Sequence, residues 1–294
     1  MKISLPGLTI LLFLAILFTL TACGPAESNP EATATPLPPT SSAPAELLEP
    51  FLYDPLLPLD TDWGKTREND GVEVHTISYA SLMGDRVPAY YVKPAGEGPY
   101  PAVIFLHCGH NASCTKAEFA YEANQLAQRG IASLSIDGPL LRLSDAIFDP
   151  EQMFIYSVLD IRRGIDLLVS QPEIDGGKIG YVGHSYGATT GGILAGVETR
   201  IKALVFMVGH PQVSIANAQE EIQHLDAVHY IPYSGHAASL FQFAEEDLFI
   251  SREAAEYYFE IALEPKEIQW YDADHDLNSQ AMYDRLDWLE RNLK

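Results

Sequence analysis

The sequence predicts an α/β protein whose central sheet is mostly parallel and is covered by helices on both faces. From about residue 100 onward, continuous apolar runs typical of buried strands alternate with longer stretches of helical periodicity. A Gly-x-Ser-x-Gly stretch, 183–187, lies between such a run and a segment of small residues, as in a sharp strand-to-helix turn. With 294 residues, 47% of them hydrophobic, the chain is long enough for one large domain.

The expected strands begin with a hairpin. Two strand-like runs, 72–80 and 87–93, flank the turn sequence Met83-Gly84-Asp85. The following runs are apolar without alternation, which indicates strands covered on both faces. They are 102–107, 131–136, 179–182, 203–208, 239–243 and 267–271.

Helices are expected between these strands and after the last one. The segments with helical patterns are 116–129, 152–170, 186–196, 252–262 and 280–292. A further, partly amphipathic segment at 217–230 is expected as an addition between two strands. Regular alternation of strand and helix indicates a parallel sheet wrapped by helices.

The N-terminus reads as a targeting segment. Lys2 supplies a positive start, 8–20 is nearly all apolar, and Leu20-Thr21-Ala22-Cys23 follows. This stretch resembles the lipobox of bacterial lipoproteins. The resemblance implies removal of residues 1–22, diacylation of Cys23, and a protein held by acyl chains at the cell membrane or outer membrane, outside the cytoplasm. An ordinary secretory signal and a single anchoring helix are the alternatives.

Residues 23–52 are expected to be an extended tether. The stretch is rich in proline, alanine and threonine and has few large apolar residues, so it cannot bury enough surface to fold. The catalytic domain is therefore predicted to span 53–294.

The charge balance excludes one class of partner. Eighteen Lys and Arg against 40 Asp and Glu give a net charge of -22. Few cations are available to neutralise phosphates, so nucleic acid is not an expected partner.

The Gly-x-Ser-x-Gly stretch predicts a catalytic constellation around Ser185. A serine hydroxyl needs a base and an orienting carboxylate to become a nucleophile. The end of the 239–243 strand delivers Glu245, Glu246 and Asp247, and the end of the 267–271 strand delivers His275. Groups at the carboxyl ends of parallel strands gather at one edge of the sheet, so Ser185, one of the acids and His275 are expected to meet.

At this point the chain resembles the α/β-hydrolase family, particularly its dienelactone-hydrolase-like and esterase branch, over about residues 70–294. The likeness rests on 103–107, on 160–166 with Ile174-Asp175, on 179–187 and on 271–278. The resemblance implies Ser185 as nucleophile, His275 as base and Asp247 as the acid. Glu246 and Glu245 are lesser candidates for the acid.

An oxyanion hole is also expected, with one donor from the amide of Tyr186. The second donor should come from the loop after Leu106. The family usually has His-Gly there, whereas this chain has His107-Cys108-Gly109, so the amides of both Cys108 and Gly109 are candidates. Gly109 is favoured because a glycine lets the backbone approach the substrate closely.

Cys108 and Cys114 lie close together in the sequence with His107 and His110 beside or between them. In an exported protein a disulfide is the favoured interpretation, ahead of two free thiols or a zinc site. No metal and no cofactor are expected.

These observations predict an exported, membrane-anchored serine hydrolase that cleaves small carboxylic esters through an acyl-enzyme. The alternatives are a peptidase or thioesterase of the same fold, and a catalytically silent binding lipoprotein.

Overall fold

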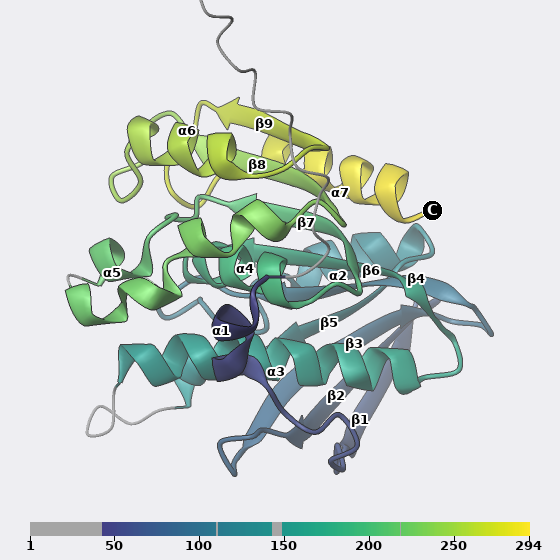
Figure 1. The fold of residues 1–294 in the computed structure, drawn as a ribbon. Helices are drawn as coiled ribbons and strands as arrows, with labels where there is room; N and C mark the ends of the chain where they lie inside the picture. The colour runs from purple at the N-terminus through teal and green to yellow at the C-terminus, as the bar shows by residue number, and fades with distance from the viewer. Residues whose placement is uncertain (1–42, 110, 143–148, 218) are drawn as a thin grey trace, which may run out of the picture. The chain divides into compact units, whose positions relative to one another are not determined.

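Nine strands form a single sheet in the computed structural model, which describes residues 43–109, 111–142, 149–217 and 219–294 (Figure 1). The strands are β1 (Asp62–Asn69), β2 (Val72–Ala80), β3 (Arg86–Pro94), β4 (Tyr100–Leu106), β5 (Ala132–Ile136), β6 (Ile174–His184), β7 (Ile201–Met207), β8 (Ala238–Ala244) and β9 (Lys266–Tyr271). Their order is β1-β2-β3-β5-β4-β6-β7-β8-β9. Strands β4 to β9 run parallel to one another. Strands β1, β2 and β3 pair antiparallel with their neighbours. The predicted mostly parallel sheet with an N-terminal hairpin is confirmed.

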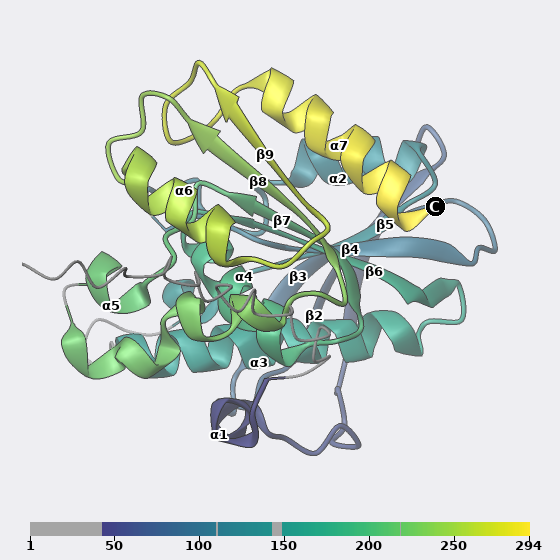
Figure 2. The ribbon, with the colours of Figure 1, turned by 45° about the horizontal axis from the view of Figure 1, so that its top comes forward.

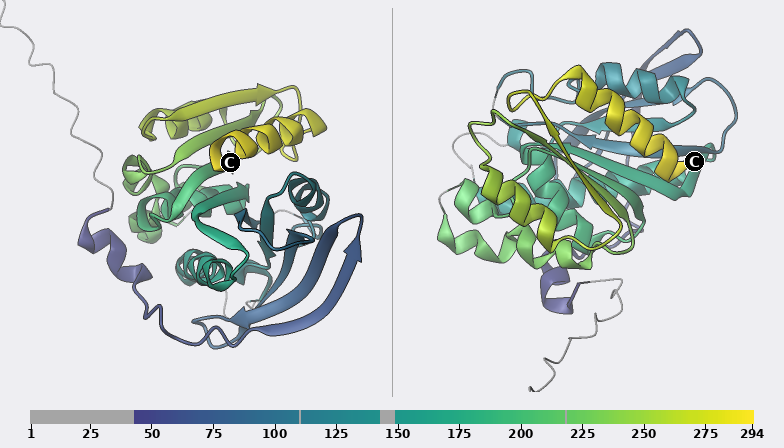
Figure 3. Two further views of the ribbon diagram at one scale, coloured as in Figure 1. Left: turned by 90° about the vertical axis from the view of Figure 1, so that its right-hand side faces the viewer. Right: turned by 90° about the horizontal axis from the view of Figure 1, so that it is seen from above.

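Helices cover both faces of this sheet (Figures 2 and 3). One face carries α2 (Ala120–Gln128) and α7 (Ser279–Leu293), whose apolar residues form one core with the sheet. The other face carries α3 (Pro150–Ser170), α4 (Tyr186–Val197) and α6 (Arg252–Ile261), which form the second core. The short helices are α1 (Ala45–Leu48) and α5 (Val213–Ala216), and short 3-10 helices lie at 49–51, 139–141, 220–225, 227–229 and 231–233. The segment between β7 and β8 thus holds the addition expected at 217–230.

Polar caps set the starts of three of these helices. The Asp149 carboxylate accepts hydrogen bonds from the first amides of α3, the Ser251 hydroxyl accepts one in α6, and the Asn278 side chain accepts one in α7. Each cap satisfies an amide that has no partner within its helix. The α4 helix is different, because its residues are buried on all sides and no cap side chain bonds its first turn. The first turn of α4 therefore lacks the side-chain cap that the other three helices have.

Strand β1 was not expected from the sequence. All of its residues are exposed, and it pairs with β2 only along one edge. An edge strand with this polar sequence has neither the continuous apolar run of a central strand nor a regular alternation, so hydrophobic patterning cannot detect it.

The domain begins earlier than the predicted boundary at residue 53. Phe51 is fully buried and packs edge-on against Tyr230, with ring centroids 5.9 Å apart. Arg162 donates a hydrogen bond to the Phe51 carbonyl oxygen (2.6 Å), and the Ala43 amide bonds the carbonyl of Gly196. Residues 43–52, predicted to be tether, are instead part of the domain. Phe51 and two leucines of this segment provide apolar surface that packs in the core. The average composition of the proline-rich stretch does not reveal them.

The predicted signal segment, the acylation site Cys23 and the rest of the tether lie outside the described residues. Within the residues that are described, no helix has the length and apolar character needed to cross a membrane.

The packing of residues 43–52 gives a stability prediction. Phe51→Ala should lower the free energy of unfolding by about 3–5 kcal/mol, because it removes a buried aromatic ring and leaves a cavity. Leu52→Ala is the matched control, since Leu52 is 71% exposed and its loss should change stability by less than about 0.5 kcal/mol. Denaturant unfolding measures both. Equal midpoints for the two variants would contradict the assignment of this segment to the core.

Candidate active site

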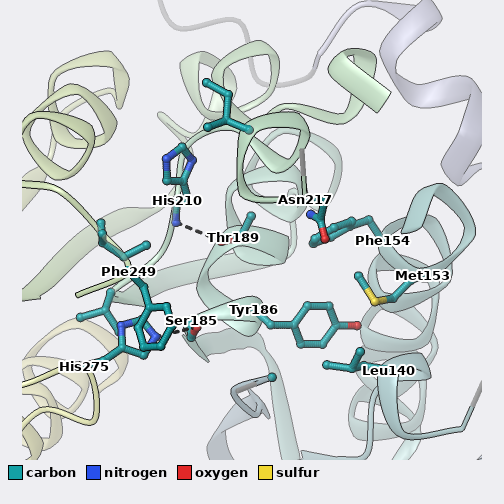
Figure 4. A pocket seen from close by; sticks show the side chains of 14 residues that line it. Leu140, Met153, Phe154, Ser185, Tyr186, Thr189, His210, Asn217, Phe249 and His275 are labelled. Atoms are coloured by element: carbon teal, nitrogen blue, oxygen red, sulfur yellow. Dashed lines mark hydrogen bonds between the residues drawn. The ribbon is translucent and has the colours of Figure 1, made fainter. Parts of the chain in front are cut away.

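Four strand ends and the first turn of α4 meet at the carboxyl edge of the parallel strands. The loops after β4, β6, β8 and β9 supply Gly109, Ser185, Asp247 and His275, respectively. Ser185, Gly109 and His275 line one cavity of about 460 Å³ (Figure 4). This edge is where open parallel sheets place their ligand and catalytic groups.

The turn from β6 into α4 holds Ser185 in an uncommon backbone conformation. Its φ is +53° and its ψ is -107°, a region that residues with a side chain rarely adopt. Two glycines make the turn possible. An added Cβ at Gly183 would lie 2.3 Å from the backbone of Gly187, and one at Gly187 would lie 2.2 Å from the carbonyl oxygen of Leu106. The Ser185 amide donates to the Met207 carbonyl oxygen (2.8 Å), which fixes the turn to β7.

A continuous chain of hydrogen bonds joins the serine, the histidine and the aspartate. The distance from Ser185 Oγ to His275 Nε2 is 2.8 Å. On the other side of the ring, His275 Nδ1 lies 2.8 Å from Asp247 Oδ2 and 3.0 Å from Oδ1. His275 is 6% exposed, and the Phe249 ring packs on it with centroids 4.7 Å apart. The histidine is therefore held between its two partners and is largely shielded from water.

The surroundings of Asp247 keep it ionised. Burial raises the pKa of Asp247, but the hydrogen bond with His275 acts in the opposite direction. The backbone amides of Phe249 and Ile250 also donate to Oδ1, at 2.7 and 3.0 Å. Together these bonds outweigh burial and bring the pKa of the carboxyl group below its usual value.

The two other acids of this loop do not reach the histidine. Glu245 and Glu246 are exposed, and their backbone amides pair with the β9 end of the sheet, at Tyr271 and Ala273. Of the three acidic candidates, the structure brings only Asp247 to His275.

Of the two amides expected as oxyanion donors in the loop after β4, one already has a partner. The Cys108 amide donates to Glu118 Oε2 (2.9 Å), so it is not available to a substrate oxygen. Gly109 lines the cavity, and a Cβ built on it would lie 3.2 Å from the Cβ of Tyr186. The expectation of Cys108 as an oxyanion donor is wrong, because its N–H is bonded to the Glu118 carboxylate. Glu118 belongs to no motif in the sequence. Tyr186 and Gly109 remain the candidates.

Cys108 and Cys114 form a disulfide in the structure. Their sulfurs lie near a Glu118 carboxylate oxygen, within 4.8 Å of one another, but disulfide sulfurs are poor ligands compared with the thiolates that zinc prefers. His107 is occupied as well, since its Nδ1 bonds the Cys108 carbonyl and its Nε2 accepts from the Gly138 amide. Burial lowers the pKa of His107, which suits this neutral form. The residues described here do not fit the zinc alternative, and His110 lies outside them.

The cavity beside Ser185 is lined mostly by apolar groups. The lining residues are Gly109, Leu140, Met153, Phe154, Ser185, Tyr186, Thr189, Val208, His210, Ile215, Asn217, Phe249, Ile250 and His275 (Figure 4). No lysine or arginine is among these residues, all of them within the described part of the chain. Arg142, a cation near this region, is paired with Asp160 (2.7 Å) and Asp85 (3.0 Å). The cavity therefore suits an uncharged, largely apolar group.

Several residues around the site lay outside every sequence motif. Phe249 and Thr189 carry no motif of their own, and only the folded loops bring them to the cavity. Glu118 precedes α2 and is distant in sequence from Ser185, yet it reaches the residue next to the serine, His184. No local signal in the sequence could have identified these contacts.

Part of this chain is similar in sequence to known thioesterases. Residues 162–284 match the family model described as BAAT / Acyl-CoA thioester hydrolase C terminal. Acyl-coenzyme A thioesterase 3 of Mus musculus is 28% identical over 141 residues, which are 48% of this chain and 29% of the mouse protein. The chain thus spans less than a third of the length of that relative.

Solved structures extend the similarity over most of the domain. The acetyl xylan esterase from Paenibacillus sp. R4 superposes with a TM-score of 0.68 at 19% identity, covering 80% of this chain and 90% of that one. Acetyl xylan esterase 1 from Thermoanaerobacterium sp. JW/SL YS485 gives a TM-score of 0.65 at 15% identity, covering 87% and 96%. The chain has the α/β-hydrolase fold, in a form similar to esterases and thioesterases, and these similarities support a hydrolase.

Proposed function

We propose that this protein is a serine hydrolase that cleaves carboxylic esters and works outside the cytoplasm, held at a membrane by a lipid anchor. The observation that carries the catalytic part is the hydrogen-bond chain from Ser185 Oγ through the His275 ring to Asp247. This arrangement supports a series of nucleophile, base and orienting acid beside a cavity that Ser185 and His275 line.

In the proposed reaction, Ser185 Oγ attacks the carbonyl carbon of the ester while His275 Nε2 takes the hydroxyl proton. The protonated histidine then gives this proton to the leaving alcohol, and an acyl group remains on the serine. A water molecule attacks the acyl-enzyme with His275 again as base, which releases the acid and restores the serine. No step needs a cofactor.

Asp247 serves this reaction in two ways. Its carboxylate accepts from His275 Nδ1, so that Nε2 is the nitrogen that accepts the proton of Ser185. Its charge also stabilises the imidazolium that forms during each step. The lowered pKa of Asp247 keeps this carboxylate ionised at neutral pH.

The negative charge on the former carbonyl oxygen is assigned to backbone amides at the start of α4 and in the β4 loop. Tyr186 is the first residue of α4, where the positive end of the helix dipole adds to its N–H. Gly109 provides the second group on the facing loop.

Active-site labelling tests the proposal. A fluorophosphonate probe should modify Ser185 and no other residue, because only an activated serine reacts with it quickly. Ser185→Ala should carry no adduct, and His275→Ala should label at least about a thousand-fold more slowly, since the serine loses its base. Peptide mapping by mass spectrometry identifies the site. An unlabelled but folded wild-type protein would favour the silent binding lipoprotein, and undiminished labelling of His275→Ala would remove the histidine from the mechanism.

The electrostatics of the site favour neutral esters over acyl-CoA thioesters. Glu246, Asp274 and Asp276 line a hollow that shares Phe249 and His275 with the active-site cavity. The described lining supplies no cation for the phosphates of coenzyme A. The matched family model keeps the thioesterase as the second candidate function, since the same serine and histidine would cleave a thioester.

Substrate comparison separates these two functions. We expect kcat/KM for a neutral short-chain aryl ester to exceed that for the corresponding acyl-CoA by about ten-fold or more at low salt. Added salt should reduce this difference in kcat/KM, because salt screens the repulsion between the acidic side chains of the hollow and the phosphates. A preference for acyl-CoA that weakens with salt would reverse the assignment.

The anchoring part of the proposal rests on the sequence around Cys23 and on the disulfide. A disulfide is typical of proteins that fold outside the reducing cytoplasm. In a bacterial host, wild-type protein should incorporate labelled palmitate and sediment with membranes, whereas Cys23→Ser should do neither. Equal palmitate incorporation by the two proteins would exclude Cys23 as the anchor.

A further inference from the structure

A second acid–histidine pair lies directly behind the first one. His184 is the last residue of β6 and immediately precedes Ser185, and it is 3% exposed. Its Nδ1 lies 2.5 Å from Glu118 Oε1, and its Nε2 lies 3.0 Å from the backbone carbonyl oxygen of His275. The rings of His184 and His275 are close, with centroids 5.6 Å apart.

The contacts of His184 with Glu118 and with the His275 carbonyl constrain where protons lie. A backbone carbonyl can only accept, so Nε2 must donate to the His275 oxygen. A neutral imidazole then has a bare Nδ1, which would face a carboxylate oxygen with no proton between them. The geometry therefore requires one proton to be held between Nδ1 and Glu118 Oε1, as an imidazolium–carboxylate pair or its neutral equivalent.

Glu118 also has a second partner. Its other oxygen, Oε2, accepts from the amide of Cys108 at 2.9 Å, in the loop that follows β4. This loop is closed by the disulfide from Cys108 to Cys114, four residues before Glu118. One carboxylate thus bonds both the loop that carries Gly109 and the residue beside the nucleophile.

We propose that Glu118 and His184 form a positioning pair that holds the Gly109 loop and the backbone of His275 in register with Ser185. Neither residue lines the cavity beside Ser185, so the pair acts through the groups that it holds and is not catalytic itself. The inference rests on the proposed serine-hydrolase function and assigns to that site an internal support. Oxyanion donors and bases are effective only when their positions are fixed before the reaction, which is what this bridge supplies.

The chain offers a matched control for this pair. Glu73 and His75 on β2 form another carboxylate–imidazole contact, 3.1 Å long, in the antiparallel part of the sheet. Glu73 also pairs with Lys93, and neither member of the contact lines the active-site cavity. Removing Glu73 changes a similar bond without touching the loops around Ser185.

A conservative change separates position from charge. In Glu118→Gln, the amide oxygen can still accept from the Cys108 N–H, and the amide NH₂ can donate to Nδ1 of a neutral His184. His184 Nε2 keeps its proton and its bond to the His275 carbonyl. All three connections survive without an ionic pair, whereas Glu118→Ala removes both connections that the carboxylate makes.

The experiment compares Glu118→Ala, Glu118→Gln and Glu73→Ala with the wild type in a full-length, oxidised protein. For a neutral ester, Glu118→Ala should lower kcat about a hundred-fold with little change in KM, as expected for catalytic groups displaced by about 1 Å. Glu118→Gln should recover kcat to within about ten-fold of the wild type, and Glu73→Ala should retain it. Fluorophosphonate labelling rates should follow the same order, and thermal unfolding shows whether each variant is folded.

Three results would overturn the positioning role. One is wild-type kcat in a folded Glu118→Ala variant. Another is a glutamine variant as slow as the alanine variant, which would make the charge rather than the bonding geometry responsible. The third is a Glu73→Ala variant that loses as much kcat as Glu118→Ala, which would indicate a general effect on stability.

The labelling experiment also keeps this inference distinct from the proposed function. If the wild-type protein is not labelled at Ser185, the serine-hydrolase proposal fails and takes the positioning pair with it. If the wild type and a folded Glu118→Ala variant are labelled at equal rates, the hydrolase stands and only the positioning role is wrong.

Discussion

The close approach of the first turn of α4 to the end of β4 is the constraint on which the site depends. At Gly187 the backbone lies so near the Leu106 carbonyl that no side chain would fit, and Gly183 is held equally close to Gly187. In the turn that these glycines permit, Ser185 has a positive φ and its hydroxyl lies 2.8 Å from His275 Nε2. The turn also aligns the N-terminus of a fully buried helix with the cavity. The strain at one residue is thus offset by the burial of α4 around it.

Two carboxylate–imidazole pairs occupy this edge of the sheet, and they differ in what they face. His275 bonds Ser185 on one side of its ring and Asp247 on the other, and Ser185 and His275 both line the cavity. Glu118 and His184 bond backbone groups, namely the amide of Cys108 and the carbonyl oxygen of His275. The two pairs therefore differ in what the far ring nitrogen contacts, which is a hydroxyl for His275 and a carbonyl oxygen for His184.

Charge is distributed unevenly between the surface and the site. The chain carries a net charge of -22, and acidic side chains gather in the hollow beside His275. The cavity itself is mostly apolar, and its described lining includes no cation. Under the proposed function, the acidic side chains of this hollow would repel an anionic substrate. An uncharged substrate would not experience this repulsion.

The sequence by itself determined the layered architecture, the order of the parallel strands along the chain, the serine turn, and the positions of Asp247 and His275 at strand ends. These features are local: continuous apolar runs, helical periodicity and paired glycines follow from short-range sterics and burial. Only the tertiary structure decided the rest. β1 is too polar to be recognised as an edge strand, and Phe51 belongs to the core only because it meets Tyr230. The Glu118 carboxylate accepts a hydrogen bond from the Cys108 amide, and no spacing rule in the sequence predicts this contact. Such contacts depend on which surfaces the fold brings together, so the local sequence around each residue cannot predict them.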